Sequence, residues 1–457
     1  MRSAGFFRAA FLALTATVAM ALAGPAVASA TDLSPQEARK LAEEAVLAGD
    51  PALARALALA LLQRDPHDSD AARILSAAED LLGNDRAARA AARQAWRTAE
   101  GAGERYAAAR QRALAEYHAE NYGTAQWWLR RAAQAAPDDR ARALARENFR
   151  SVERQNPWAL GLRFSLAPSS NINNGSSAET MDFFGVPFLL SGDARALSGT
   201  EASLSLSARY RLSPAGARNR TELRFGAVSK TYRLSSQARA QAPNARGSDY
   251  AFSAVELGIG HRRRLDDRTS LSLGATAGHN WYGGRDLSDY LRLDGDLSYA
   301  LDRRNWLELG LGIEEQMRLD ARFLSARTAE LRAGYGHVTG SGDRLHFGLA
   351  LRDTASDGVA IDHRAAALDF DWSRAAPLAG IRLTGGLSAE LRDYAQSRFG
   401  GTRLDRRLGA HLGMVFERVD YYGFSPSLDL NASRTLSNFS LYDTRDLGVS
   451  LGFASNF

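Results

Sequence analysis

Hydrophobic residues follow two different periods along the chain. In the first third, apolar side chains recur three and four positions apart, as do Ala38, Leu41 and Ala45, which places them on one face of an α-helix. Later, apolar and polar residues alternate, as in the segment 203–212, which is the period of a β-strand with one apolar face. The pattern predicts a helical domain over residues 31–156 and a β domain over residues 157–457.

The helical segment carries turn residues at a regular interval. Gly49-Asp50 and Gly83-Asn84 lie 34 residues apart, which is the period of tetratricopeptide repeats, and Glu120-Asn121-Tyr122 occupies the equivalent position of a third unit. Small side chains follow these turns, where helices must pack closely: Ala54, Ala87 and Ala125. We predict three degenerate tetratricopeptide-like repeats and a capping helix, over residues 33–66, 67–101, 104–137 and 139–154.

Four aromatic residues of the helical domain have two interpretations. They are Trp96, Tyr122, Trp127 and Trp128. Aromatic residues at helical spacing usually pack in a core, and we expect this of at least two of the three tryptophans. Repeats of this kind also present a concave surface that binds peptides, so the same residues are candidates for a surface that binds a partner protein. Either way the domain is predicted to be an interaction module.

The alternating half predicts fourteen strands. Their expected ranges are 158–168, 200–212, 219–232, 250–264, 268–281, 288–301, 304–315, 327–338, 344–353, 362–374, 381–393, 404–417, 423–434 and 444–457. A soluble β-sandwich could alternate in the same way, but here short and longer connections also alternate. Short periplasmic turns and longer extracellular loops are typical of outer-membrane barrels. A phase shift between Phe252 and Val255 predicts either a bulge in the fourth strand or an error in its assignment.

The predicted fold class is therefore α + β multidomain. A tetratricopeptide-like helical repeat domain precedes a 14-stranded antiparallel transmembrane β-barrel. An even number of strands returns the C-terminus to the side of the helical domain, which we expect to be periplasmic, with the long loops outside the cell.

The first thirty residues are predicted to be a secretory signal peptide. Arg2 and Arg8 precede an apolar run, and Ala28-Ser29-Ala30 forms a small-residue cleavage site. This agrees with location in a Gram-negative outer membrane. A retained anchor is the alternative, but the run is short for a membrane-spanning helix.

Composition removes several classes of function. The chain has no cysteine, which excludes disulfides, thiolate zinc sites and thiol nucleophiles. The 57 basic residues exceed the 52 acidic ones only slightly and are dispersed, so we expect no nucleic-acid partner. All basic residues except Lys40 and Lys230 are arginines, which codon bias explains more simply than phosphate binding does.

No arrangement of residues points to catalysis. The eight histidines are scattered, and no phosphate-binding glycine loop or nucleophile elbow occurs. Asp294 with Asp296, and Asp369 with Asp371, share polar strand faces and could bind a cation, although a wet barrel lumen explains them equally well. We expect no enzyme activity, no cofactor and no metal site.

The last strand ends as barrel assembly signals do. Leu451, Phe453 and Phe457 alternate with small or polar residues up to the end of the sequence. Such an ending resembles the signal by which outer-membrane barrels are recognised, so the barrel assembly machinery is an expected partner.

The order of segments resembles the surface lipoprotein assembly modulator (Slam) family. The residues that carry the resemblance are Asn156-Pro157-Trp158 and the exit of the first strand, where Pro168, Asn171, Asn173 and Asn174 form a Pro followed by an Asn-x-Asn run. The last hairpin, from Ser437 to Tyr442, is also similar. Asparagines of this kind form turns by hydrogen bonding to local backbone.

The resemblance implies an outer-membrane translocation factor. Such proteins deliver lipoproteins, or in some members soluble secreted binding proteins, from the periplasm to the cell surface. The implied partners are this client protein, a periplasmic chaperone and outer-membrane lipid, with the repeats engaging the client or its chaperone and the barrel providing the route.

Three other classes remain as alternatives. An exopolysaccharide export porin also joins tetratricopeptide repeats to a barrel, but it has a longer repeat array and should show lumenal aromatics and acidic rows. A plain porin needs no periplasmic repeat domain. An outer-membrane enzyme needs a Ser/His/acid set that no spacing here supports.

Overall fold

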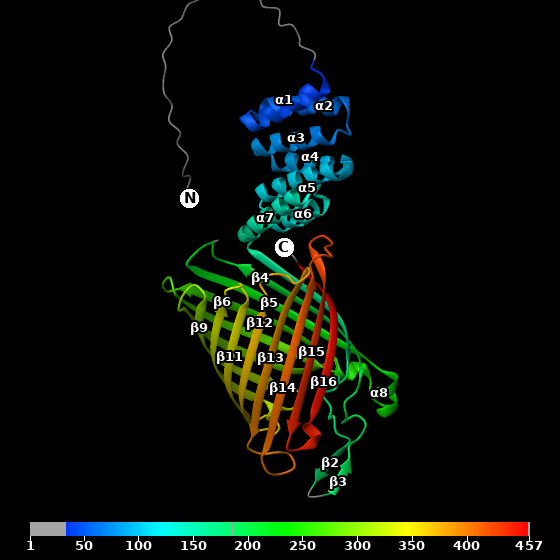
Figure 1. The fold of residues 1–457 in the computed structure, drawn as a ribbon, viewed down its shortest axis with the longest axis vertical. Helices are drawn as coiled ribbons and strands as arrows, with labels where there is room; N and C mark the ends of the chain where they lie inside the picture. The colour runs from blue at the N-terminus through cyan, green and yellow to red at the C-terminus, as the bar shows by residue number, and fades with distance from the viewer. Residues whose placement is uncertain (1–32, 184–185, 215, 456–457) are drawn as a thin grey trace, which may run out of the picture.

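The computed structural model describes residues 33–183, 186–214 and 216–455 (Figure 1). The predicted signal peptide and Phe457 lie outside these residues. The helical domain contains α1 (Pro35–Ala48), α2 (Pro51–Arg64), α3 (Ser69–Leu81), α4 (Asp85–Thr98), α5 (Gly101–His118), α6 (Tyr122–Ala135) and α7 (Asp139–Gln155). Three helical hairpins and a final helix are thus formed, as the repeat pattern predicted. Among the described helices, none combines the length and the apolarity that crossing a membrane demands.

The elbows of the second and third hairpins share one construction. In the second hairpin the Asn84 amide donates to the Glu79 carboxylate at 2.7 Å, and in the third the Asn121 amide donates to Glu116 at 2.9 Å. Each asparagine precedes the second helix of its hairpin and so ties that helix back to the first. In the first hairpin the equivalent residue, Asp50, instead accepts a hydrogen bond from the Leu53 N–H of the second helix at 3.0 Å.

The small residues behind the elbows are buried, with one correction. Ala54 and Ala125 are fully buried, as expected. In the second hairpin the fully buried residue is Ala88, while Ala87 lies at the edge of a groove. The prediction of Ala87 was wrong by one position, because the alanine run of α4 conceals which of its members faces α3.

The β domain is a closed barrel. Its strands are β1 (Trp158–Ser169), β4 (Gly199–Arg211), β5 (Asn219–Leu234), β6 (Phe252–Arg264), β7 (Thr269–Tyr282), β8 (Arg285–Ala300), β9 (Asn305–Arg318), β10 (Ala326–Val338), β11 (Arg344–Ser356), β12 (His363–Ser373), β13 (Ile381–Tyr394), β14 (Arg403–Phe416), β15 (Phe424–Ser437) and β16 (Thr444–Ser455). Each pairs antiparallel with its neighbours, and β16 pairs with β1 to close the ring. The fourteen strands of the described barrel confirm the predicted fold class.

Register is continuous along most of the barrel. The predicted bulge near Phe252 is absent from the described pairing, because β6 pairs without a shift with both β5 and β7. The observed irregularity lies one strand later, between Asn280 and Trp281, where β7 meets β8. Both positions break the alternation of apolar residues, but only the second adds a residue to the ladder.

The closure between β1 and β16 is sparse. Two registered pairs join these strands, Leu166 with Leu451 and Ser169 with Gly448, whereas β1 pairs with β4 along its whole length. Pro168 lies between the two paired positions of β1 and has no N–H to donate. The seam therefore has fewer pairs than the other side of β1.

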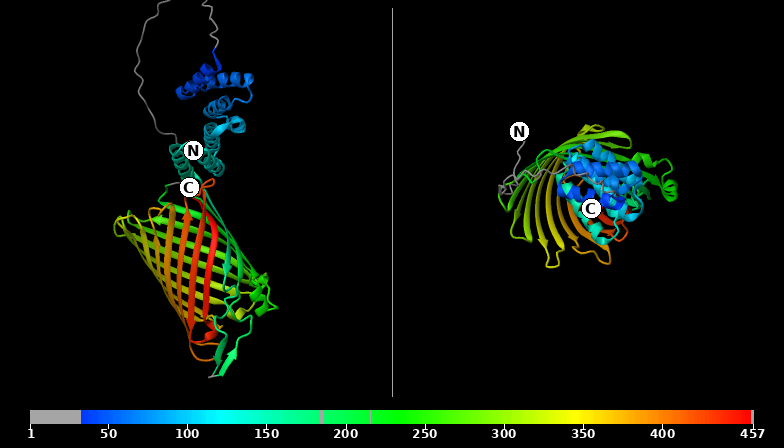
Figure 2. Two further views of the ribbon diagram at one scale, coloured as in Figure 1. Left: turned by 45° about the vertical axis from the view of Figure 1, so that its right-hand side comes forward. Right: turned by 90° about the horizontal axis from the view of Figure 1, so that it is seen from above.

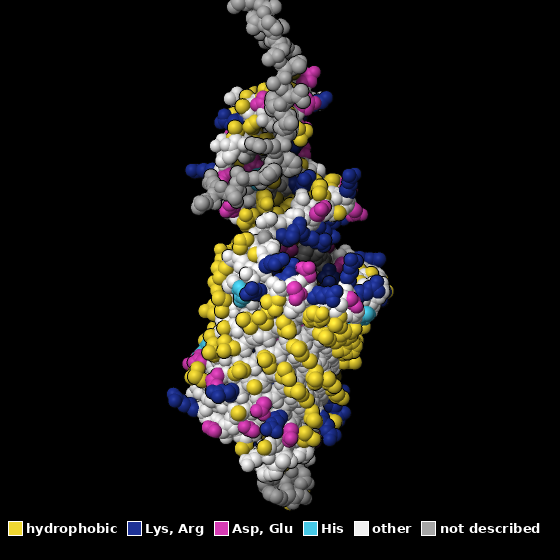
Figure 3. Space-filling view, turned by 90° about the vertical axis from the view of Figure 1, so that its left-hand side faces the viewer, with side chains coloured by type: hydrophobic (Ala, Val, Ile, Leu, Met, Phe, Trp, Pro, Cys, Tyr) yellow, Lys and Arg dark blue, Asp and Glu magenta, His cyan; other side chains and the backbone are white. Residues whose placement is uncertain are grey.

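Apolar side chains form a belt around the outside of the barrel. Leu160, Leu257 and Leu311 are each more than 60% exposed, and they alternate with polar residues that point inward. Figure 3 shows the belt as a band between zones that carry charged side chains. Exposed apolar surface of this extent has no stable place in water, and it matches the lipid-facing surface of a transmembrane barrel. The β domain is a membrane-spanning barrel of the outer-membrane type.

The helical domain stands at one end of this barrel. Seen from above, it covers one side of the barrel end, while the yellow and yellow-green strands lie clear of it (Figure 2). At the opposite end are the β2–β3 hairpin (Thr180–Phe183, Val186–Leu189) and α8 (Ser236–Gln241), which belong to the two longest loops (Figure 1). We call this the remote end.

Candidate functional site

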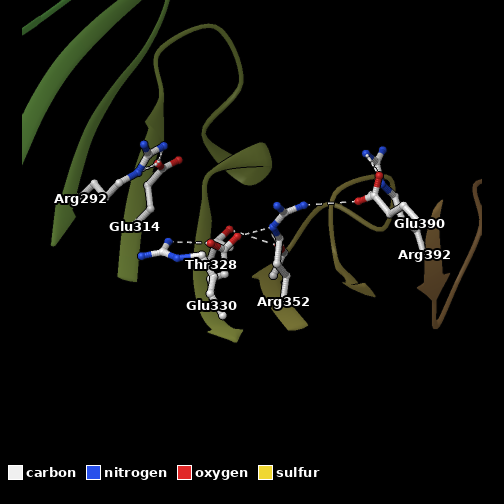
Figure 4. A network of polar contacts seen from close by, with 9 residues as sticks. Arg292, Glu314, Thr328, Glu330, Arg352, Glu390 and Arg392 are labelled. Carbon is white, nitrogen blue, oxygen red and sulfur yellow. Dashed lines mark hydrogen bonds and ion pairs between the residues drawn. The ribbon is translucent and has the colours of Figure 1, made fainter. Parts of the chain in front are cut away.

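Charged residues line one wall of the barrel lumen as a continuous chain of ion pairs (Figure 4). The lumenal ion-pair chain consists of Asp296, Arg332, Glu330, Arg352, Glu390 and Arg392, from strands β8, β10, β11 and β13. Each residue has the opposite strand parity from the exposed leucines, so alternation alone directs it inward. Acidic and basic members alternate, and the chain is neutral overall.

Glu330 is the centre of this chain. One oxygen accepts from Arg332 at 2.7 Å, and the other accepts from Arg352. Arg332 also reaches Asp296 on β8 at 2.8 Å, and Arg352 lies 3.4 Å from Glu390 on β13. Gly310 leaves room for the first contact, since a Cβ at this position would lie 2.5 Å from the Asp296 carboxylate. The wall is thus polar and cross-linked over several strands.

Other inward residues are paired as well. Arg292 donates to Glu314 at 2.8 Å, and the Tyr290 hydroxyl donates to Glu256 at 2.8 Å. At the remote end Arg403 donates to Asp405 and stacks between the rings of Tyr394 and Tyr442. These arrangements pair the charges of the inward-facing side chains with one another.

In each acidic pair singled out from the sequence, one carboxylate lies beside a basic side chain. Asp296 bonds to Arg332, and Asp371 lies 3.7 Å from His411. Within the described residues, no cluster of three or more His, Asp or Glu side chains is placed to hold a metal ion.

A second functional region is the junction between helices and barrel. The Arg130 guanidinium of α6 donates to the carbonyl oxygens of Tyr422 and Gly423 at 3.3 and 3.2 Å, and to the Ser455 hydroxyl at 2.9 Å. The same group lies over the rings of Phe149 on α7 and Phe424 on β15, 4.8 and 4.6 Å from their centres. Burial lowers the pKa of Arg130, although an arginine stays charged at any physiological pH.

An ion pair and a cap complete this junction. Arg146 of α7 lies 2.7 Å from Asp420 in the β14–β15 turn, and Gln134 accepts from the Tyr422 N–H at 3.0 Å. From β4, Arg211 donates to the last carbonyls of α7, at residues 154–156. Helices α6 and α7 are therefore held against the barrel at the ends of β4, β15 and β16. Sequence reasoning missed this region, because its partners lie hundreds of residues apart and follow no period.

The aromatic candidates of the helical domain divide into core and surface. Trp128 is buried, and Trp96 and Tyr122 pack against the same cluster. This confirms the expectation of at least two core tryptophans, and it removes Trp128 from the proposed binding surface. Trp127 remains 47% exposed, with the Arg131 guanidinium 3.8 Å from its ring centre.

A groove lies elsewhere on the helical domain, beside α3 and α4. It has a volume of about 710 Å³ and is lined by residues that include Pro66, Leu75, Ala87, Ala90 and Arg97. Small side chains of α4 leave the space, and Glu79 and Arg97 supply charge of both signs. Its lining residues include no Trp, Tyr or Phe, so a search of the sequence for these residues could not find the groove.

The asparagines after β1 organise the longest loop at the remote end. Asn171 exchanges two hydrogen bonds with the backbone of Gly175, at 2.9 and 2.8 Å. The Asn173 amide joins the carbonyls of Asp193 and Arg195 and accepts from Leu197. Asn174 has the left-handed conformation, with φ 49°. These are the local backbone bonds expected of turn-forming asparagines.

The loop that follows the Asn-x-Asn run lies beside the last hairpin. The Ser176 hydroxyl donates to the Ser440 carbonyl at 2.6 Å, and the Ser440 hydroxyl donates to the Thr180 carbonyl at 3.0 Å. The loop after β1 is thereby joined to the last hairpin at the remote end. At the other end of β16, Leu451 and Phe453 face outward and are exposed. Their role as an assembly signal stays a prediction.

Comparison with known proteins gives only low similarities. No protein-family profile and no curated protein sequence matches this chain. The first TPR domain of human RPAP3 is similar over 26% of this chain and 90% of its own, at 13% identity and a TM-score of 0.24. A bacterial polysaccharide outer membrane secretin is similar over 65% of this chain and 98% of its own, at 9% identity and a TM-score of 0.34. The outer membrane channel DcaP of Acinetobacter baumannii is similar over 65% of this chain and 97% of its own, at 11% identity and a TM-score of 0.36. The strand pairing and apolar belt of this chain therefore define its class.

Proposed function

We propose that this protein is an outer-membrane translocation factor that delivers lipoproteins, or related soluble binding proteins, from the periplasm to the cell surface. The observation that carries the proposal is the junction: a helical repeat domain is bound through Arg130 and Arg146 to one end of a membrane-spanning barrel. A porin has no need of such a domain. A factor that must collect a protein before passing it on does need one.

The interior of the barrel supports a hydrophilic cargo. The lumenal ion-pair chain presents alternating charge over four strands. A polypeptide segment can form and break hydrogen bonds with such a wall at little cost in free energy. When the segment moves on, the side chains of the wall pair with one another again. No covalent chemistry is required of the wall.

The groove beside α3 and α4 is the proposed point of first contact with the client or its chaperone. Its volume suits a short peptide segment, and its lining combines small apolar side chains with Glu79 and Arg97. The exposed Trp127 is a second candidate on the same domain. In this proposal the helical domain is periplasmic, the remote end is extracellular, and the barrel assembly machinery inserts the chain.

Surface exposure of client proteins tests the proposal. The surface proteome of intact cells would be compared between the wild type and a deletion of this chain, by protease shaving and mass spectrometry. We expect a small set of lipoproteins or secreted binding proteins to disappear from the surface while their periplasmic amounts stay constant or rise. An unchanged surface proteome with altered capsular or matrix sugar would overturn the proposal in favour of the polysaccharide export porin.

A matched pair of variants connects the result to the groove. Ala90→Phe fills the groove from the exposed face of α4, and Ala60→Phe adds the same side chain to an exposed position of α2 outside it. In the deletion strain, the Ala60 variant should restore client exposure and the Ala90 variant should not. Equal restoration by both would remove the groove from the mechanism while leaving the translocation function intact.

A further inference from the structure

Three arginines lie on the lipid-facing surface near the remote end of the barrel. Arg406 of β14, Arg434 of β15 and Arg445 of β16 have the strand parity of the exposed leucines, so their side chains point away from the lumen. Register places Arg434 directly opposite Arg445. We call these residues the arginine triad. All three are exposed.

The triad has no counter-ion within the described part of the protein. None of its members forms an ion pair or hydrogen bond there, although Asp393 lies diagonally across the strand pair from Arg406. Other outward arginines at this end do have partners: Arg327 lies 2.7 Å from Glu315, and Arg364 lies 3.1 Å from Asp353. Like charges directly opposite each other on a sheet are destabilising, so the pair Arg434 and Arg445 calls for an anion from outside the chain.

An apolar hollow adjoins the triad on the same outer surface. It has a volume of about 740 Å³, and Arg434 and Arg445 form part of its lining. The remainder is mainly apolar and small, including Leu408, Ala410, Ala432 and Leu447. The hollow lies within the belt that faces hydrocarbon, where a lipid chain would fill it. On one continuous surface, two arginines therefore lie beside an apolar hollow that can hold an acyl chain.

We propose that the arginine triad and this hollow bind a phosphorylated glycolipid of the outer leaflet, with its phosphates on Arg434 and Arg445 and an acyl chain in the hollow. Guanidinium groups bind phosphate through paired, charge-assisted hydrogen bonds. The choice of glycolipid follows from the orientation in the proposed function, which puts the remote end in the outer leaflet, where lipid A carries two phosphates. The site is independent of the client.

Lipid binding by the purified full-length protein tests this site. The protein would be titrated in mild detergent with bis-phosphorylated lipid A, and bound lipid would be measured by native mass spectrometry. Arg434→Gln with Arg445→Gln should bind about tenfold more weakly than the wild type, because two charge-assisted contacts are lost. The lysine variants, Arg434→Lys with Arg445→Lys, should retain part of the affinity. Arg327→Gln with Arg364→Gln removes two paired arginines at the same end and should bind as the wild type does.

Two results would overturn the proposal. One is equal binding of lipid A by the wild type and the Arg434/Arg445 glutamine variant; the other is equal binding of dephosphorylated lipid A or phosphatidylglycerol by the wild type. Heat-dependent migration of the barrel in electrophoresis would show that each variant is folded. Because these measurements involve no client, loss of the lipid site with normal client exposure would reject this inference alone. If the wild type binds lipid A as expected but deletion of the chain leaves client exposure unchanged, the proposed function alone would be rejected.

Discussion

A single residue of the third helical elbow adopts the conformation that the first two elbows give to glycine. Gly49 and Gly83 both have φ 75°, and Glu120 has φ 60° at the equivalent position. The left-handed region costs an L-residue with a side chain roughly 1–2 kcal/mol. The Glu120 side chain is exposed and forms no hydrogen bond or ion pair in the described residues that would offset this cost.

Replacing Glu120 with glycine should therefore stabilise the third hairpin, by about 0.5–1 kcal/mol after the greater entropy of the unfolded glycine chain is counted. Hydrogen exchange of the full-length protein, followed by mass spectrometry over α5 and α6, measures the effect as slower exchange. Gly83→Glu is the matched control and should accelerate exchange over α3 and α4. Unchanged exchange in both variants would contradict the conformational explanation.

A buried carboxylate makes the helical domain sensitive to acid. Burial of Glu79 opposes its ionisation, but the hydrogen bonds from Arg55 and Asn84 outweigh that effect, and the net result is a lowered pKa. A carboxyl with a lower pKa in the folded state contributes stability above its unfolded pKa of 4.5. That contribution is lost as the pH falls from 4.5 through the lowered folded value.

Glu79→Gln should consequently destabilise the helical domain at pH 7, since the amide cannot accept both hydrogen bonds. Bonds of this charged kind contribute about 1.5–3 kcal/mol each. The difference in melting temperature between wild type and variant, followed by far-ultraviolet circular dichroism at 222 nm, should be large at pH 7 and should shrink below pH 4.5. A difference that is constant with pH would show that the carboxylate charge is not the cause.

At the scale of elements, the local period of the sequence predicts the strands and their lipid-facing sides. It does not predict which distant residues contact each other. Alternation predicted fourteen strands, and the structure confirms them, because one apolar face per strand is enough to fix which residues face lipid. The same alternation identifies Glu330 and Arg352 as lumenal but cannot show that they meet. Partner choice depends on register between strands, which no single strand encodes.

The junction shows this limit most clearly. Arg130 and Arg146 lie on helices whose pattern indicates only an apolar face and a charged face, and Asp420 lies in a short turn. Their contacts arise because β14 returns the chain to the helical end of the barrel, where the β14–β15 turn carries Asp420, Tyr422 and Gly423. The choice between core and surface for Trp127 and Trp128 stayed open for a related reason, since helical spacing does not distinguish the core face of α6, where Trp128 lies, from the adjacent exposed position of Trp127.

Helices α6 and α7 should separate from the barrel when their central contact is removed. Because the chain has no natural cysteine, Gln134→Cys with Tyr422→Cys provides a pair across the junction. We expect this pair to form a disulfide readily in the otherwise wild-type protein and much more slowly when Arg130→Ala is added. Arg142→Ala is the control and should leave the rate unchanged, because this half-exposed residue of α7 forms an ion pair with Asp139 of its own helix. An unaltered rate in the Arg130 variant would mean that the other contacts suffice.

For the whole molecule, the decisive property is its direction in the membrane. The helical domain and the end of β16 share one side of the barrel, and the β2–β3 hairpin and α8 share the other (Figure 1). The proposed function requires the first side to be periplasmic.

Cysteine labelling in intact cells tests this direction. Leu189→Cys on the β2–β3 hairpin, where the native side chain is 77% exposed, should react with a membrane-impermeant maleimide. Trp127→Cys on α6 should react only after the outer membrane is permeabilised. The reverse result would place the helices outside the cell and would contradict both the proposed function and the outer-leaflet lipid site.

The sparse β1–β16 seam has a consequence for the order in which the molecule is made. Its two pairs join residues from opposite ends of the barrel sequence, so their closure bears the largest loop entropy of any strand pair and cannot begin until the last strand exists. Every other neighbouring pair follows directly along the chain and can form as a growing curved sheet. We therefore expect the barrel to pass through an open curved sheet, with β1 and β16 as its two free edges, before the ring closes.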